Sequence, residues 1–353
     1  MVMHDVANVT STGHTIHHTM DRANTDPSTP MYSNVLGRAF AAQSKEYGLP
    51  ADAQEHNRLN AQHNMIKALI DGLYFPPDLV KKALDPTDSS KRRGVMDVGA
   101  GSGIWAVEMA KEFPSAEVVG MDLVYPANLT ETLPNCRFEI GDANLDWGRY
   151  AEAFDVVHMR SVATGIKDFK ALLHNVAQTL RSQGVILLVS PILRFYSETK
   201  ELLQDQVEGM PGWSAMAAFH AISSQATMKR GGSGFAICDY WVEWLTEMPF
   251  YTNVGERDFW IPIGPWKEGL DESERAAAEL LRQVASEVIS PMTLRLLEGG
   301  YDEDLIDRWA VEGDADDGTE NVYDMEVRLG DEVSGAVVSA MKPVSGRKKV
   351  QRD

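Results

Sequence analysis

Three glycines that alternate over five residues most constrain how this chain can fold. Gly99, Gly101 and Gly103 follow a short apolar run that carries one carboxylate, Asp97, and a helical pattern of apolar residues begins directly after them. This order predicts a buried strand, a tight turn and a helix. Glycine lets the backbone pass close to a ligand, and the first N–H groups of a helix lack partners within it. The turn is therefore a candidate site for a nucleotide-like ligand.

The spacing of the glycines differs from that of the dinucleotide fingerprint. That fingerprint reads G-x-G-x-x-G, and its last glycine packs the helix against the strand. Here Ala100 stands inside the turn, the third glycine comes one residue earlier, and the pattern reads D-x-G-x-G-x-G. The pattern resembles motif I of class I S-adenosylmethionine (SAM) methyltransferases. The resemblance implies that the turn passes under the methionine moiety of SAM and that Asp97 orders the turn.

Acidic residues also end the next two expected strands. The second strand ends in Asp122 and Leu123, and the third ends in Asp142 and Ala143. An acid at the end of the second strand can accept hydrogen bonds from both ribose hydroxyls. In the resembled family an acid at the third strand contacts the adenine amino group, and Leu123 would pack against one face of the ring. Trp147, just beyond, is either a cover for the adenine or a core tryptophan.

Strands and helices alternate through the middle of the chain. Strands are expected at 95–98, 116–123, 136–142, 154–159 and 184–190, and helices at 104–113 and 169–180. Such alternation predicts an α/β fold with a mostly parallel sheet and right-handed crossovers. The resemblance specifies a Rossmann-like class I methyltransferase sheet with an antiparallel last strand, expected at 335–341. Ligands of such sheets lie beyond the carboxyl ends of the strands, where the three acids stand.

Changes of pattern divide the chain into six segments. These are a disordered tail (1–30), an N-terminal helical segment covering the core (31–93), the SAM-binding core (94–193), an inserted helical cap with the substrate region (194–249), a C-terminal part that completes the sheet (250–343) and a basic tail (344–353). Outside the core, helices are expected at 51–73, 78–84, 198–208, 213–228, 238–247, 271–298 and 302–311, and a strand at 250–263. The acidic stretch 302–332 is otherwise typical of a solvated surface and loop.

Charge and composition limit the classes of partner. The net charge of −19 argues against nucleic acid, because phosphate binding depends on Lys and Arg, but it leaves a basic peptide open. The two cysteines and the histidines near the N-terminus lack the spacing of a disulfide framework or a metal site, so no metal is expected. No window approaches 18 apolar residues, which predicts no membrane span and a cytoplasmic protein.

Further motifs narrow the resemblance to fungal LaeA-like (UMTA-type) methyltransferases, over roughly residues 50–343. The helix EHNRLNAQHNMIKALIDGLY at 55–74 is similar to the E-x-x-R-L-x-x-Q-H helix of that family. The segments FDVVHMRSV and IPIGPW and the final MKP also follow its order. The resemblance implies SAM as the cofactor and S-adenosylhomocysteine as its product.

Candidate catalytic residues stand where the fourth strand ends and in the cap. His158 and Arg160 share one face of that strand, and Ser161 follows them. His158 is a candidate general base, because the pKa of imidazole lies near working pH, but a hydrogen-bonded core histidine fits the same position. His220 in the cap is a second candidate. A phenol or a carboxylic acid as substrate would need little base.

Three functions stay open at this point. The first is methylation of an oxygen or nitrogen atom of a small secondary metabolite, for which the Met-rich and aromatic segment 194–249 would supply an apolar pocket. The second is a LaeA-like regulator that acts through protein partners, which would place the protein in the nucleus. The third is a SAM-binding enzyme of pericyclase type that transfers no methyl group. Helices 51–73 and 271–298 leave a homodimer and a monomer equally open.

Overall fold

A computed structural model describes most of the chain between Tyr32 and Met341. The described residues are 32–35, 37–87, 92–126, 129, 131, 133–145, 147–190, 194–197, 201–203, 207–208, 210–211, 213–257, 259–265, 267–308, 323–327 and 337–341. The predicted tails 1–30 and 344–353 lie outside them. None of the helices in these ranges combines the length and the apolar character that crossing a membrane would require.

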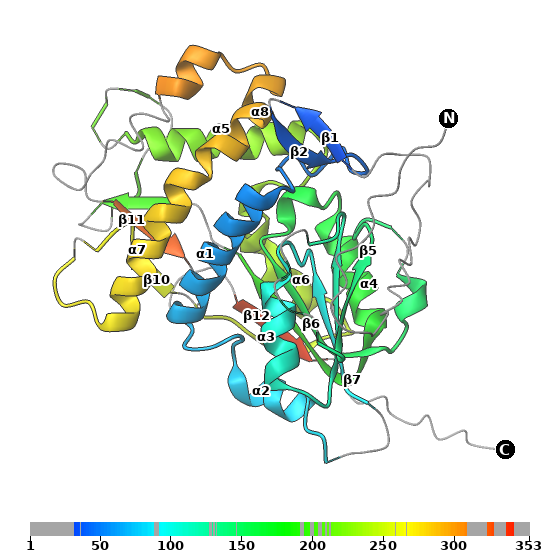
Figure 1. The fold of residues 1–353 in the computed structure, drawn as a ribbon. Helices are drawn as coiled ribbons and strands as arrows, with labels where there is room; N and C mark the ends of the chain where they lie inside the picture. The colour runs from blue at the N-terminus through cyan, green and yellow to red at the C-terminus, as the bar shows by residue number, and fades with distance from the viewer. Residues whose placement is uncertain are drawn as a thin grey trace, which may run out of the picture.

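A seven-stranded sheet organises the molecule (Figure 1). Its order is β5 (Cys136–Ile140), β4 (Glu117–Asp122), β3 (Gly94–Val98), β6 (Phe154–Arg160), β7 (Leu180–Val189), β12 (Val337–Met341) and β9 (Thr252–Gly255). The first five strands pair in parallel, and β12 pairs antiparallel with both β7 and β9. The predicted fold class, a mostly parallel sheet with an antiparallel last strand, is confirmed.

Both faces of the parallel strands are buried, as crossover helices require. On β6 the neighbours Val156 and Val157 belong to hydrophobic clusters on opposite faces of the sheet. One face packs against α4 (Phe169–Thr179) and α6 (Trp241–Glu247), and the other against α2 (Pro77–Ala83) and α3 (Ile104–Glu112). Short 3-10 turns occur at Gly148–Tyr150, Ala163–Gly165 and Phe235–Tyr240.

A second layer of helices lies over the carboxyl ends of the strands. Helix α1 (Ala53–Leu69) runs beside α7 (Glu272–Glu287), and α5 (Ala215–Lys229) packs against α8 (Ile289–Glu298) (Figure 1). Capping explains where two of them begin: the Asp52 side chain accepts from Glu55 N, and Asp271 with Glu274 forms a capping box. The hairpin of β1 (Tyr32–Val35) and β2 (Arg38–Ala41) precedes α1.

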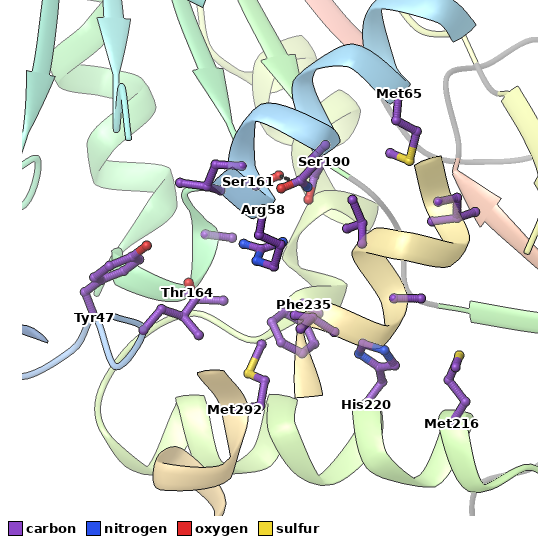
Figure 2. A pocket seen from close by; sticks show the side chains of 18 residues that line it. Tyr47, Arg58, Met65, Ser161, Thr164, Ser190, Met216, His220, Phe235 and Met292 are labelled. Atoms are coloured by element: carbon purple, nitrogen blue, oxygen red, sulfur yellow. Dashed lines mark hydrogen bonds between the residues drawn. The ribbon is translucent and has the colours of Figure 1, made fainter. Parts of the chain in front are cut away.

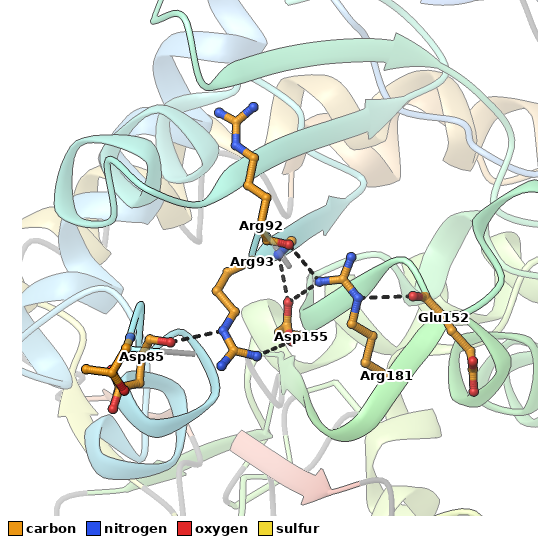
Figure 3. A network of polar contacts seen from close by, with 8 residues as sticks. Asp85, Arg92, Arg93, Glu152, Asp155 and Arg181 are labelled. Carbon is orange, nitrogen blue, oxygen red and sulfur yellow. Dashed lines mark hydrogen bonds and ion pairs between the residues drawn. The ribbon is translucent and has the colours of Figure 1, made fainter. Parts of the chain in front are cut away.

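The amino ends of the strands are joined by one buried carboxylate (Figure 3). Asp155 on β6 accepts from Arg93 Nη1 at 3.1 Å, from Gly94 N at 2.8 Å and from Arg181 Nη1 at 2.5 Å. These bonds connect the starts of β3, β6 and β7, on the side of the sheet away from the acids that the sequence singled out. Arg181, the second residue of β7, therefore has a structural role.

The prediction of a single strand at 250–263 is wrong, because this segment forms two strands. Its first part is β9 of the main sheet, and its second part is β10 (Phe259–Pro262) of a separate antiparallel sheet. The other strands of that small sheet are β11 (Tyr323–Val327) and β8 (Arg194–Ser197). The acidic stretch expected as loop thus contains a strand, because residues 323–327 pair there with two strands that are distant in sequence.

Two expected helices also differ. The helix predicted at 271–298 is divided at Val288 into α7 and α8. Pro291 explains the division, because proline lacks an N–H and its ring excludes the carbonyl four residues earlier, at the end of α7. Within the segment predicted as a helix at 198–208, Leu202 instead forms an antiparallel bridge with Tyr196. Of the helix predicted at 302–311, residues 303–308 are helical, and residues 309–311 lie outside the described residues.

Candidate functional site

A cleft, here called the loop cleft, lies at the carboxyl ends of β3, β4, β5 and β6. The space between its walls, including the part open to solvent, is about 650 Å³. Its lining includes predicted residues from four separate segments, namely Gly99, Gly101, Asp122, Leu123, Asp142, Ala143 and Arg160. The structure therefore brings together these seven of the residues that the motif spacing singled out, and Ala100 is not part of the lining.

The glycine turn is shaped by close contacts that only glycine permits. Gly99 N and Ala100 N donate to Met121 O at 2.8 and 3.0 Å, which carries the turn over the end of β4. A Cβ at Gly99 would collide with the Val162 side chain, and one at Gly101 would stand 2.9 Å from Leu59 Cδ1. Both glycines have positive φ, +70° and +56°. The turn thus presents bare backbone to the loop cleft.

Asp122 holds the turn against the second strand. Its Oδ2 accepts from Gly101 N at 2.7 Å and its Oδ1 accepts from Leu123 N at 2.7 Å. Burial raises the pKa of Asp122 to about 6, against the effect of these backbone hydrogen bonds. Each carboxylate oxygen has further lone-pair capacity, so the group can still accept hydroxyl donors from a ligand in the loop cleft.

Asp97 and His158 lie beneath the turn, outside the lining of the loop cleft. Asp97 is 3% exposed and His158 is 2% exposed. His158 Nδ1 lies 2.8 Å from Asp97 Oδ1, and its ring stacks on Trp105 at 3.8 Å. Burial lowers the pKa of His158, and Asp97 opposes this only in part. The two residues therefore form a buried neutral-imidazole and carboxylate pair that supports the loop.

Arg160 lines the loop cleft, and a hydrogen bond to a residue of α1 holds its side chain in place. Its Nη1 donates to Nδ1 of His63 at 3.1 Å, and His63 Nε2 stands 3.3 Å from an oxygen of Glu108 on α3. Burial, and next the charge of Arg160, lower the pKa of His63 to about 3, so that His63 is neutral and can accept. Arg160 is thus a positioned cation at the edge of the cleft.

Asp142 lies in the lining of the loop cleft, whereas Trp147 lies outside it. Asp142 lines the loop cleft beside Ala143, and its Oδ1 accepts from the backbone and side-chain N–H groups of Asn144. Trp147 is 5% exposed, donates from Nε1 to Ala143 O at 3.0 Å and meets Tyr150 edge-on. The structure does not bring Trp147 to the cleft, and its ring packs in the core. Gly103 also lies outside the lining and caps α3.

A second hollow, here called the apolar cavity, adjoins the loop cleft. Figure 2 shows the side chains that line this cavity. It holds about 920 Å³ between α1, α5, α7 and α8. Tyr47, Leu59 and Ser161 line both spaces and mark their junction. Most of the lining is aliphatic, thioether or aromatic, including Met65, Met216, Phe235, Leu281, Val284, Ala285, Val288 and Met292.

Few polar groups face the apolar cavity. Arg58 is bound by Glu55, and Gln62 Nε2 donates to Ser161 Oγ at 3.2 Å. Within the described residues, Thr164 Oγ1 and His220 Nδ1 are buried without a hydrogen-bond partner. Burial lowers the pKa of His220 to about 4, so its ring is neutral. Such groups can orient a ligand through hydrogen bonds without adding a charge.

Sequence reasoning did not assign Tyr47, Arg58 or Gln62 to the site. The sequence predicts a helix that covers the core at 51–73, but the prediction gives its polar side chains no role in the site. A signal was present, because Arg58 and Gln62 are four residues apart and so share one face of α1. The position of Tyr47, which precedes α1 in an irregular stretch, depends on the tertiary fold and had no local signal.

The chain has relatives among known proteins. A family model described as "Methyltransferase domain" matches residues 62–229. The "Secondary metabolism regulator laeA" of Coprinopsis cinerea is 31% identical over 274 residues, 77% of this chain and 66% of that protein. The "Methyltransferase pytC" of Aspergillus terreus is 28% identical over 272 residues, 76% of each chain. This chain thus spans slightly less than two thirds of the first relative.

A solved structure is also similar at low identity. It is the phosphoethanolamine N-methyltransferase 2 of Haemonchus contortus in complex with phosphomonomethylethanolamine and S-adenosylhomocysteine, 14% identical, covering 75% of this chain and 52% of that one, with a TM-score of 0.38. The family assignment therefore rests on the sequence relatives.

Proposed function

Because this chain belongs to the LaeA-like, SAM-dependent methyltransferases, we propose that it transfers the methyl group of SAM to an oxygen or nitrogen atom of an apolar small molecule. The observation that carries the proposal is the pair of adjoining hollows. A cleft that carries Asp122, Asp142 and Arg160 meets a larger apolar cavity across Tyr47, Leu59 and Ser161. A donor and an acceptor bound on the two sides of this junction would be held next to each other.

The residues of the loop cleft fit SAM in kind. Asp122 would accept the ribose hydroxyls, Asp142 with Ala143 would frame the adenine, and Leu123 would pack against the ring. Arg160 offers a cation for the carboxylate of the methionine moiety. Bound SAM supplies a methyl group on a positively charged sulfur, and the protein supplies position and an environment from which water is excluded.

The apolar cavity supports a small molecule as acceptor. Apolar and aromatic lining with a few placed polar groups is typical of small-molecule sites. Its lining comes from four helices and from four further segments, at Tyr47, Ser161, Ser190 and Phe235, which suits a compact ligand. The acceptor would bind at the junction of the two spaces. His158 lies below the glycine turn and His220 lies on the α5 wall, so neither histidine is placed at that junction.

Incubation with SAM labelled in the methyl group tests the proposal. The purified protein is mixed with an extract of a host that lacks the gene, and small molecules and S-adenosylhomocysteine are quantified. We expect one labelled small molecule formed in a 1:1 ratio with S-adenosylhomocysteine. Label found in protein alone, together with a stable protein partner, would favour the regulatory function. Turnover of a metabolite while SAM is not consumed would favour a reaction of the pericyclase type.

A further inference from the structure

Arg58 is the single charged residue among the described residues that line the apolar cavity. Glu55, one turn earlier on α1, holds it through two bonds: Arg58 Nη2 lies 2.6 Å from Glu55 Oε1, and Nε lies 3.0 Å from Oε2. The Arg58 and Glu55 side chains are 7% and 1% exposed. A bidentate pair of this kind fixes the plane of the guanidinium. Arg58 is therefore a rigid group in the wall of the cavity.

The pairing with Glu55 leaves part of the guanidinium available. Arginine carries five N–H donors, and Nε and Nη2 are the nitrogens that Glu55 contacts. Within the described part of the chain, Nη1 makes no hydrogen bond. Nη1 therefore keeps its N–H donors available to a ligand acceptor in the apolar cavity. The acceptor that an arginine binds most strongly is an oxyanion.

Arg58 stands close to the junction with the loop cleft. Its neighbour Leu59 lines both spaces and lies against Gly101 of the glycine turn. One turn further along α1, Gln62 donates to Ser161, which also lines both spaces. A group bound at Arg58 Nη1 is thus held at the end of the apolar cavity that faces the cofactor side.

The junction lacks a group that could remove a proton. None of the described residues lining the apolar cavity is Asp or Glu, and its one imidazole is His220. That ring stacks on Phe195 at 5.0 Å on the α5 wall. Burial raises the pKa of the Tyr47 phenol at the junction, and Glu55 adds to the rise, so Tyr47 stays protonated. A hydroxyl acceptor would therefore lack a base here, and an oxygen acceptor has to arrive already ionised.

On the premise of the proposed function, we propose that the methyl acceptor is the carboxylate of an otherwise apolar molecule, bound at Arg58, and that the product is its methyl ester. One carboxylate oxygen accepts from Arg58 Nη1, and the other forms the new C–O bond to the methyl group. The S–CH₃ bond breaks and its electron pair stays on sulfur as neutral S-adenosylhomocysteine. No proton is transferred, which agrees with a junction that lacks a base.

The apolar surroundings favour this step, because it removes two opposite charges. A sulfonium and a carboxylate are consumed, and two neutral products are formed. Opposite charges attract more strongly where water is excluded, and the neutral ester loses the ionic contact that held the acid. The ester would therefore bind less tightly than the acid, which helps product release. A phenol, in contrast, has an ordinary pKa near 10 and would need a base at neutral pH.

Alkaline lability of the labelled product tests the acceptor. Products formed from methyl-labelled SAM and the extract are treated with mild alkali, which hydrolyses a methyl ester but not a methyl ether or a methylamine. We expect the label to be released as methanol. Label that stays in an alkali-stable small molecule would overturn the carboxylate and leave the proposed function intact. If no small molecule is labelled, both proposals fail.

Variants of the buried pair test the role of Arg58. The double variant Glu55→Gln/Arg58→Gln leaves no unpaired buried charge, and with the acid as substrate we expect KM to rise about 10- to 100-fold. Arg58→Lys, which keeps a charge, should lose less. Lys170→Gln, which breaks a surface pair with Glu247, is the matched control and should behave as wild type. A folded double variant with unchanged KM and unchanged affinity for SAM would overturn the assignment of Arg58.

Discussion

His158 lies 2.8 Å from Asp97 with its Nδ1 facing the carboxylate, and both side chains are below the glycine turn, not within the cleft that the turn lines. A carboxylate can only accept, so the proton of the ring is on Nδ1. Since β3 and β6 are neighbouring parallel strands, the bond joins their carboxyl ends directly under Gly99. The pair thus joins the two strand ends from which the turn and the segment after β6 leave the sheet.

Loss of this pair should affect stability and SAM binding together. Asp97→Ala leaves the His158 donor buried without a partner, and we expect the free energy of unfolding to fall by about 1–3 kcal/mol. Urea denaturation and calorimetry of SAM binding measure the two effects. For His158→Gln we expect weaker SAM binding but a pH–rate profile with the same apparent pKa values. Loss of one of those pKa values would instead identify His158 as the general base.

Substitution of Asp122 should weaken SAM binding, because the two hydrogen bonds proposed between its carboxylate and the ribose hydroxyls would be lost. For Asp122→Ala we expect a loss of about 1–3 kcal/mol in binding free energy. The pKa of Asp122 is raised to about 6, and the positively charged cofactor favours its ionised form. The affinity of the wild type should therefore decrease as pH falls through about 6, and that of Asp122→Asn should not. Calorimetry that finds Asp122→Ala as tight as wild type would refute the ribose role.

Gly99 can be tested with a compensating change. Gly99→Ala places a Cβ against Val162 and also strains a residue with φ of +70°. We expect weaker SAM binding and a loss of stability of about 1–3 kcal/mol. Adding Val162→Ala should restore part of the loss, since it removes the contact but leaves the backbone strain. If the double variant is no better than Gly99→Ala in both measurements, Val162 does not set the path of the turn.

The sequence identified the loop cleft better than the apolar cavity, and the reason is physical. The turn at Gly99 and the acid at Asp122 are local features of a strand end, and the order of parallel strands brings such ends to one edge. The apolar cavity depends on packing between α1 and α7, which are about 200 residues apart in the sequence, and periodicity does not reveal that pairing. Trp147 illustrates the same limit, since its position in the chain fitted the cleft and its side chain packs in the core.

His220 should make the protein sensitive to acid. Its pKa is lowered by burial to about 4, below the 6.5 of an exposed imidazole, so between these values the unfolded chain binds a proton that the folded chain does not. Stability contributed by this residue is therefore complete above pH 6.5 and falls as pH decreases towards 4, by up to about 3 kcal/mol. His220→Phe keeps a ring against Phe195 and should reduce the acid loss of stability, measured by urea unfolding at pH 7 and pH 5. Identical losses in both proteins would contradict the prediction.

Filling the apolar cavity should separate acceptor binding from cofactor binding. Ala285 on α7 is 9% exposed and lines the apolar cavity but not the loop cleft. Ala285→Phe adds a ring inside this space, so we expect turnover to fall at least about tenfold while the affinity for SAM stays within about twofold. Ala276→Phe places the same ring nine residues earlier, on the opposite face of α7, and serves as the control. Both variants should fold, because the cavity has room for the ring at 285 and Ala276 is only partly buried. Equal turnover in the two variants, with SAM binding intact, would mean that the acceptor binds elsewhere.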